Sequence, residues 1–380
     1  MDLLCAVRSC SFFLFYFTIS CGCIAYFLIF MQNKDMNIAT ALNRKYVKYA
    51  AVMLTSVCES NAEHVDAYLL HTELTDADIA ALREALSAYD IRICPLKVEA
   101  DRIDQRLPRS ESWSVEMYFR LLLPELLPES VERILYLDVD MIVNRSVRAL
   151  YETDFSATAH QNNTNGGILL KNMPLPAGGE YEIIGALDSN GIFTEADYTE
   201  KQLTMLAPLF ASGRYYFNSG MMLMNIAAIR KRCTFQTYLD AAKRWRYEMR
   251  APDQDLLNDV HWERTGYVDW KLYDLFAGHA HTDGATYEEV KENAAIIHFS
   301  GNKPWNADFF HYDIQQLWWD YAKKTPFYHA LLEELLHKML FDPSLERSIE
   351  ASVRKNNELQ GLIDRLTEVN RKLMDALGLS

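Results

Sequence analysis

Two aspartates directly after a strongly apolar run are the residues of this sequence best placed to bind a metal ion. Asp138 and Asp140 follow the run RILYL at residues 133–137. On an extended backbone, residues i and i+2 point to the same side, so both carboxylates can face one cation. Oxygen ligands suit Mg²⁺ and Mn²⁺, which bridge diphosphate oxygens and neutralise the charge that develops as a diphosphate leaves. Taken alone, such a pair is more often a solvated turn.

A second group of polar residues ends another apolar run, at residues 294–299. His298 closes this run, and Gly301 and Lys303 follow it. A nitrogen ligand beside two carboxylates shifts the metal preference from Mg²⁺ towards Mn²⁺. The glycine permits close approach of the backbone to a ligand, and the lysine could neutralise a phosphate. A lone histidine is usually structural, but this setting makes His298 a candidate third ligand.

These residues need elements that bring them together, and the hydrophobic pattern predicts alternating strands and helices. Apolar runs of strand length occupy residues 36–42, 65–71, 90–96, 133–137, 215–225 and 294–299. Apolar residues at helical spacing occupy residues 46–58, 75–86, 114–127 and 234–249. The alternation predicts an α/β fold, with a mostly parallel sheet covered by helices on both faces. Ligands of such sheets bind at the carboxyl ends of the strands, where Asp138 and Asp140 lie.

Residues 160–215 interrupt this alternation. They are rich in asparagine and glycine at first and contain only a short helical pattern, around residues 201–207. A long irregular excursion inside a compact domain is commonly a lid or a binding segment. We therefore expect an acceptor to dock on this part of the chain.

Composition and charge exclude some classes of protein. The formal net charge is −14, and no block of lysine and arginine stands out, so nucleic acid is not an expected partner. There are seven cysteines and no Cys-x-x-Cys pair, and Cys58, Cys94 and Cys233 leave an odd number after the N-terminal stretch. This pattern is neither a disulfide framework nor a zinc site, and it indicates a reducing compartment such as the cytoplasm.

The first 35 residues form an apolar N-terminal segment. Residues 10–31 are nearly uncharged and long enough to cross a bilayer as a single helix. Only a few residues separate them from the first predicted strand, which leaves no stem between an anchor and the folded domain. Two interpretations stay open: a short membrane anchor that makes the protein membrane-associated, or a mis-assigned start with Met36 as the true first residue.

The C-terminal part, residues 311–380, is predicted to be helical and to follow a main domain at residues 36–310. In residues 345–377, leucines and valines recur with a spacing close to 3.5 residues. Two or three such heptads are marginal for a coiled coil. A helix docked on its own domain and a homodimer contact are therefore both open.

Four motifs together resemble the family 8 glycosyltransferases. They are LYLDVDMIV, FNSGMMLMN, APDQDLLN and HFSGNKPW, and they occur in this order between residues 36 and 305. The resemblance implies a GT-A fold and retaining transfer of a hexose, glucose or galactose, from a UDP-sugar. Members include bacterial lipopolysaccharide galactosyl- and glucosyltransferases and glycogenin. It further implies a glycan or glycolipid acceptor in the synthesis of a cell-surface polysaccharide or lipopolysaccharide.

Residue by residue, the resemblance also assigns roles. Asp138, Asp140 and His298 would be ligands of Mn²⁺, with Mg²⁺ as the alternative ion. The end of the first strand, with Ala39, Ala41 and Asn43, would line the uridine pocket, and Arg120 would contact the donor. Asn218, Asp253 and Gln254 would hold the sugar beside the anomeric carbon, the last two being the catalytic candidates. Gly301 and Lys303 would embrace the diphosphate.

Two positions depart from the family pattern. Asn43 stands where many relatives have an aspartate, which is expected to loosen uracil recognition. The last motif has one residue fewer than usual between Gly301 and Lys303, so the direction of the lysine is in question.

Retention of configuration leaves two routes. A double displacement needs a carboxylate on the face opposite the leaving group. Gln254 is a poor nucleophile, and Asp253 is the only acid that the sequence places nearby. We therefore favour attack from the face that the leaving group vacates, with the departing phosphate as base.

Two other functions remain as alternatives. A phosphatase of the haloacid dehalogenase type also ends a strand in Asp-x-Asp, but it prefers Thr or Val where this chain has Ile142. A non-catalytic module that binds a UDP-sugar or carbohydrate would keep the same sheet and tail. Metal-dependent binding of a UDP-sugar would test this second alternative.

Overall fold

The computed structural model describes residues 35–109, 114–156, 175–176, 179–188, 198–307, 311–341 and 344–377. The apolar segment at residues 10–31 and much of the excursion at residues 160–215 lie outside these ranges. Within them, none of the helices combines the length and the apolar character needed to traverse a bilayer.

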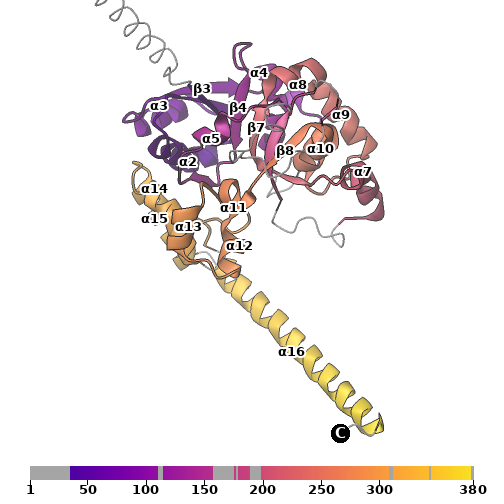
Figure 1. Ribbon diagram of the computed structural model, residues 1–380. Coiled ribbons are helices and arrows are strands. Elements are labelled where there is room, and N and C mark those ends of the chain that lie inside the picture. Colours follow the sequence, from indigo (N-terminus) through magenta and orange to yellow (C-terminus); the bar gives the residue numbers. More distant parts are fainter. Residues whose placement is uncertain are drawn as a thin grey trace, which may run out of the picture.

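A seven-stranded sheet forms the centre of the molecule, in the order β3-β2-β1-β4-β7-β6-β8 (Figure 1). Neighbouring strands run parallel except at β7, which is antiparallel to both β4 and β6. The expected α/β fold with a mostly parallel sheet is therefore confirmed. The strands are β1 Met36–Ala41, β2 Val65–His71, β3 Ile91–Lys97, β4 Arg133–Leu137, β6 Ile183–Leu187, β7 Phe217–Asn225 and β8 Thr265–Val268.

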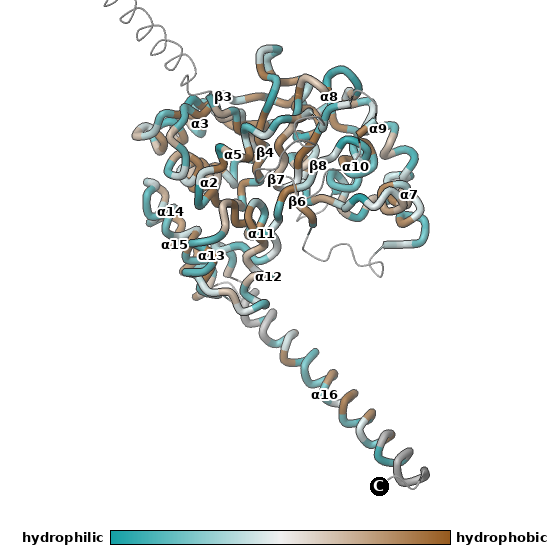
Figure 2. Tube along the Cα trace, in the orientation of Figure 1, coloured by the Kyte–Doolittle hydropathy of each residue, from teal (hydrophilic) through white to brown (hydrophobic). Residues whose placement is uncertain are grey.

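Strand β4 shows why its sequence is apolar without interruption. Ile134 and Tyr136 pack into the core on one face of the sheet, whereas Leu135 and Leu137 pack into the core on the other. Successive strand residues point to opposite faces, so a strand covered on both sides needs apolar residues at every position. In Figure 2 the hydrophobic positions accordingly gather along the central strands and the helices that face them.

Helices cover both faces of this sheet. One face packs against α2 and α3, and the other against η3, α9 and α10. The described helices and 3₁₀ turns are η1 Arg44–Tyr46, α2 Val47–Ser60, α3 Asp76–Ala85, η2 Ala100–Arg102, η3 Val115–Leu122, α4 Leu123–Leu126, α5 Arg148–Tyr151, α7 Glu200–Ala211, α8 Ile226–Arg232, α9 Phe235–Arg244, α10 Pro252–His261, η5 Trp262–Arg264, α11 Trp270–Tyr273, α12 Ala277–Thr282, α13 Tyr287–Asn293, η6 Asp313–Gln315, α14 Gln316–Ala322, α15 Tyr328–Phe341 and α16 Ser344–Leu377.

One predicted helix has a different form, and two strands of the main sheet were not predicted. The predicted helix at residues 114–127 is mostly the 3₁₀ helix η3, which continues into the short α4. Strand β6 lies inside the excursion that was expected to be irregular, and β8 was not predicted. Both strands are short, and each is held by pairing with strands distant in sequence, which local periodicity does not report.

A small second sheet joins the two sequence motifs that carry the candidate metal ligands. Its strands β5 (Met141–Val143), β10 (Ile296–His298) and β9 (Leu275–Phe276) lie in the order β5-β10-β9. Antiparallel pairing of β5 with β10 places His298 opposite Met141. The backbone N–H of Phe299 also donates to the carbonyl of Asp140 over 2.9 Å.

The first C-terminal helix is part of the same core. Trp305 stacks on Tyr49 of α2 with ring centroids 4.1 Å apart, and it contacts Trp318 of α14 at 4.9 Å. Trp318 is fully buried. Trp305 thus fastens α14 to the sheet through α2, which is a packing role.

The last helix behaves differently. Helix α16 extends away from the rest of the molecule (Figure 1). Its described apolar side chains are largely exposed, for example 57% for Leu366. The alternative in which this helix docks on its own domain is therefore wrong for the described side chains.

Candidate active site

The three predicted metal ligands lie together at the ends of β4 and β10. Asp138, Asp140 and His298 each offer a ligand atom, and these atoms all lie within 4.8 Å of one another. The reason differs from the expected one, because residues 138–140 form a turn after β4. In this turn the N–H of Met141 donates to the carbonyl of Asp138 over 3.2 Å. The turn, together with β10, brings two oxygen ligands and one nitrogen ligand to one point.

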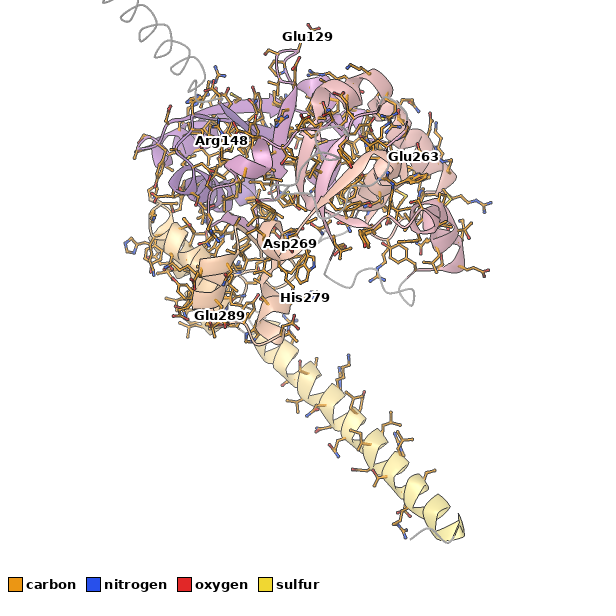
Figure 3. All side chains as sticks on the ribbon, viewed as in Figure 1. Glu129, Arg148, Glu263, Asp269, His279 and Glu289 are labelled. Atoms are coloured by element: carbon orange, nitrogen blue, oxygen red, sulfur yellow. The ribbon has the colours of Figure 1, made fainter. Side chains whose placement is uncertain are left out.

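His298 is oriented by a buried carboxylate that the sequence analysis did not single out. Its Nδ1 lies 3.0 Å from Asp274 Oδ1, and its ring stacks on Phe276 with centroids 4.8 Å apart. If Nδ1 carries a proton and donates it to Asp274, the lone pair of Nε2 is free to bind a metal. Asp274 follows α11, between Asp269 and His279, which are labelled in Figure 3. Such a carboxylate could have been suspected only after His298 had been assigned as a ligand.

Burial and neighbouring charges shift the pKa values of His298 and of its partner Asp274. Burial opposes the charged imidazole, but Asp140 and Asp274 outweigh it and raise the pKa of His298 to about 10. Burial raises the pKa of Asp274 to about 6. A cation bound between Asp138 and Asp140 would compete with the imidazole proton, as metal ions generally do at histidine ligands.

Lys303 lies beside Asp140 despite the shortened last motif. Its ammonium forms an ion pair with Asp140 Oδ2. Burial alone would raise the pKa of Asp140, but Lys303 and His298 hold it well below the ordinary range. Gly301 has a positive φ of 77°, a conformation that favours glycine, and it turns the chain between β10 and the lysine. Lys303 is thus directed towards the candidate metal cluster, and its contact with a diphosphate stays a prediction.

Arg120 is a buried arginine that links two carboxylates of the site. Its Nη2 donates to Asp138 Oδ1 over 2.7 Å, and its Nε lies 3.2 Å from Asp253 Oδ2. Nη1 donates to the carbonyl of Ser219 over 2.6 Å, and only 6% of the side chain is exposed. Two carboxylates of the protein, Asp138 and Asp253, thus neutralise the buried guanidinium of Arg120. Contact of Arg120 with a donor stays a prediction.

The remaining predicted sugar-site residues form one hydrogen-bonded chain. Asn218 Nδ2 and the N–H of Ser219 both donate to Gln254 Oε1, over 3.0 and 2.9 Å. Gln254 Nε2 in turn donates to Asp188 Oδ2 over 2.7 Å, and Ser219 Oγ donates to Asp253 Oδ2 over 3.0 Å. Asp188 follows β6 in the same way that Asp138 follows β4. It was missed because β6 was not recognised as a strand.

The residues at the end of β1 differ in their access to a ligand. Ala39 is fully buried opposite Tyr136 of β4, whereas Ala41 and Asn43 are partly exposed. Asn43 Oδ1 accepts from the N–H of Lys45 over 3.0 Å, so its side chain also caps η1. Of these three predicted donor contacts, only Ala41 and Asn43 have exposed surface.

Glu116 is a further buried carboxylate in this region. It is 8% exposed, and its Oε2 has no hydrogen-bond partner among the described atoms. Its charge acts on Tyr46 together with those of Lys303 and Asp140, and burial is the main reason that the pKa of Tyr46 is raised. No motif pointed to Glu116, and its place beside the site is known only from the fold.

Gly220 allows His298 to reach the aspartates. A Cβ at this position would lie 2.7 Å from His298 Cε1 and 2.8 Å from Met141 Cε. Real Cβ atoms do not approach so closely, so a side chain here must displace the imidazole or the strand.

We expect Gly220→Ala to raise the metal concentration needed for half-maximal activity by about 10- to 100-fold, a typical effect of disturbing the residues around a metal ligand. Titration of activity with Mn²⁺ would measure it. Gly278→Ala is the matched control, because the nearest atom to its Cβ would be Tyr312 Oη at 3.7 Å, an ordinary contact. Equal metal titrations for the two variants would show that Gly220 is not needed for the site.

A second group of metal-binding residue types is a structural network instead. Glu182, Cys233 and His261 are buried and close together. Arg232 already occupies both carboxylate oxygens of Glu182, and His261 Nδ1 lies 2.7 Å from Oε2. His261 Nε2 lies 2.8 Å from Tyr238 Oη, so both ring nitrogens have partners.

This network predicts a pH-dependent loss of stability. Burial raises the pKa of Glu182, but Arg232 and His261 outweigh it and lower the pKa to about 2. Since the folded-state pKa is depressed, the stabilisation is present above the ordinary glutamate range and is lost as the pH falls towards about 2.

Glu182→Gln should therefore lower the free energy of unfolding by about 2–4 kcal/mol at neutral pH. Denaturant unfolding at neutral pH and near pH 3 should show the gap to the parent chain shrinking with acid. Glu248→Gln, which removes an exposed partner of Lys201, is the control and should change little. A gap that is independent of pH would mean that packing, not charge, sets the effect.

Comparison with known proteins shows the family of this chain and agrees with its fold. A sequence profile described as Glycosyl transferase family 8 matches residues 37–308, which include every predicted site residue. The chain therefore belongs to Glycosyl transferase family 8 and is a glycosyltransferase. The phosphatase alternative is excluded by this membership.

Relatives and solved structures point the same way. The lipopolysaccharide 1,3-galactosyltransferase of Salmonella typhimurium is 23% identical over 310 residues, covering 80% of this chain and 83% of that protein. The lipopolysaccharide 1,2-glucosyltransferase of Escherichia coli K12 is 21% identical, covering 72% and 74%. The galactosyltransferase LgtC, solved with donor and acceptor sugar analogues, superposes with a TM-score of 0.59 at 19% identity, covering 77% of this chain and 96% of LgtC. The fold is therefore GT-A.

Proposed function

We propose that this glycosyltransferase moves a hexose, glucose or galactose, from a UDP-sugar to a glycan or glycolipid of a bacterial cell surface, with retention of configuration. One observation carries the proposal: the O, O and N ligand atoms of Asp138, Asp140 and His298 converge beside Lys303 at the carboxyl end of β4. This is the edge of an α/β sheet at which nucleotides bind.

The donor set fits a divalent cation. Two carboxylates and an imidazole suit Mn²⁺, with Mg²⁺ as the alternative, and such an ion supplies neutralisation of the diphosphate charge. Lys303 pairs with Asp140 of the cluster, so it lies close enough to neutralise part of the diphosphate charge. When a diphosphate binds, its oxygens would compete with Asp140 for the Lys303 ammonium.

Other residues of the chain position the reacting groups. Arg120 contacts both Asp138 and Asp253 and so fixes these two side chains relative to each other. Gln254 is held on both sides, by Asn218 and by Asp188, so its amide is presented in one orientation. We assign Asn218, Gln254 and Asp188 to the hydroxyls of the transferred sugar and Asp253 to the neighbourhood of the anomeric carbon.

The environment of Asp253 supports attack from the face that the leaving group vacates. Its Oδ2 lies 3.2 Å from the guanidinium of Arg120 and accepts from Ser219 Oγ. A carboxylate oxygen held by two donors is a weak nucleophile. The acceptor hydroxyl would then lose its proton to the departing phosphate, without a covalent intermediate on the protein.

The names of the relatives support the proposed sugar and acceptor. The Salmonella relative is named as a galactosyltransferase and the Escherichia relative as a glucosyltransferase, both acting on lipopolysaccharide. The described cysteines Cys58, Cys94 and Cys233 are free thiols, which supports a cytoplasmic location, with or without attachment to the membrane.

A donor screen tests the proposal. The purified full chain would be incubated with UDP-glucose, UDP-galactose and other UDP-sugars, with Mn²⁺ or with chelator, and release of UDP would be followed. We expect slow Mn²⁺-dependent hydrolysis of UDP-glucose or UDP-galactose. Metal-dependent binding without turnover in the presence of acceptor glycans would support the binding-module alternative. Turnover that is insensitive to chelator would contradict the metal assignment.

A further inference from the structure

Helix α16 carries an apolar stripe that nothing described in this chain covers. Val353, Leu359, Leu362, Ile363, Leu366 and Val369 are each between 47% and 57% exposed. The helix spans 34 residues, which is about 50 Å at 1.5 Å per residue, and most of it lies beyond the catalytic domain (Figures 1 and 2). The exposed apolar residues extend over positions 353–369, about 25 Å of this helix, and such an exposed apolar face indicates a partner.

The stripe has the heptad pattern of a two-stranded coiled coil. With Ile363 at an a position, Leu359 and Leu366 fall at d, and the sequence continues this register to Leu373. Isoleucine at a with leucine at d favours two strands over three or four. Leu362 and Val369 at g positions flank this seam and would cover it further.

Asparagines in the same seam fix its direction. Asn356 lies at the a position one heptad before Ile363, and Asn370 lies one heptad after it. In a parallel, in-register pair, each asparagine amide meets its own copy and can hydrogen-bond to it. In an antiparallel pair, a positions face d positions, so each asparagine amide would be buried against leucine without a partner.

The charges of α16 favour a protein partner over a membrane surface. Its polar positions hold six basic and six acidic residues. A helix that lies on anionic lipid typically has a polar face rich in lysine and arginine. The mixed charges instead suit the solvent-exposed faces of a coiled coil, where they also form pairs such as Arg371 with Glu368.

We propose that the stripe formed by residues 353–369 binds a second copy of the same helix as a parallel two-stranded coiled coil. Both catalytic domains then lie at the same end of the coil, because α16 leaves each domain at its N-terminal end. The dimer thereby presents two sites to one acceptor surface. Association through α16 requires neither the donor nor the acceptor.

Light scattering of the full chain during size-exclusion chromatography tests the association. We expect about twice the 43.9 kDa chain mass at micromolar concentration. The double variant Leu359→Glu with Leu366→Glu should halve this mass, since it places charges at both d positions. The control Arg354→Glu with Gly361→Glu alters f positions, where a Cβ on Gly361 meets no atom within 4 Å, and should stay dimeric.

Oxidative cross-linking tests the direction and register. Asn356→Cys should give a disulfide-linked dimer on a non-reducing gel. Arg354→Cys, on the opposite face, should give no more disulfide-linked dimer than the parent chain. A monomeric parent chain, a trimeric or tetrameric mass, or equal cross-linking at both positions would overturn the proposal. So would a monomer that binds anionic vesicles through this stripe. Donor hydrolysis should be unchanged in all variants, because α16 lies outside the family match.

Discussion

Asp140→Asn is expected to lower Mn²⁺-dependent donor hydrolysis by about three orders of magnitude. The substitution removes one of the two carboxylates proposed as metal ligands and the charge that faces Lys303 and His298. A metal ion commonly supplies several kcal/mol of transition-state stabilisation, and each ~1.4 kcal/mol is a factor of ten in rate. The amide is nearly the same size as the carboxylate, so the fold should be retained.

Two measurements make this result interpretable. Mn²⁺ binding by calorimetry should weaken together with UDP release, and thermal unfolding should stay close to that of the parent chain. Asp283→Asn, at an exposed position outside the site, is the control and should leave both properties unchanged. Activity within about tenfold of the parent chain would show that Asp140 is not a metal ligand.

Arg120→Met should both unfold the protein more easily and remove its activity. The guanidinium is 6% exposed and holds Asp138 and Asp253, which would be left without a counter-charge. Removing one partner of a buried ion pair typically costs about 3–5 kcal/mol. Burial raises the pKa of Asp138 and Arg120 lowers it, so the variant should raise that pKa further. Protons would then displace the metal at higher pH.

The control for this prediction is an exposed arginine that also forms an ion pair with a carboxylate. Arg106 pairs with Asp104, but its side chain is 62% exposed, so Arg106→Met should change stability little. Denaturant unfolding and the acid limb of the activity profile would be compared for the two variants. Arg120→Met could instead be as stable as Arg106→Met and lose activity at the same acidic pH as the parent chain. Arg120 would then not be needed to neutralise Asp138 and Asp253.

The sequence was sufficient for the parts that depend on local pattern. The continuous apolar run at residues 133–137 predicted a strand covered on both faces, and β4 has these bounds. The helix predicted at residues 75–86 is observed as α3, which begins directly after its N-cap Thr75, because side-chain capping involves only near neighbours in the chain. The candidate metal ligands Asp138, Asp140 and His298, which the structure brings together, were also named from the sequence through the motifs that contain them.

Contacts between distant segments could not be read in this way. Asp188 and β6 were missed because β6 is defined by pairing with β7 and β8, and its sequence has no strong period of its own. Asp274 was missed because its role exists only once β9 lies beside β10. The predicted i, i+2 geometry of the two aspartates was replaced by a turn, since the chain must leave β4 and enter β5 there.

The sequence by itself thus determined the class of protein, the mostly parallel sheet and the residue types of the metal cluster, because motifs and hydrophobic periods are properties of neighbouring residues. Only the tertiary structure decided that Arg120 neutralises protein carboxylates, that Gly220 makes room for His298, and that α16 stands free of its domain. Each of these depends on distances between segments far apart in the chain. Such distances are set by packing and strand pairing, which no local pattern encodes.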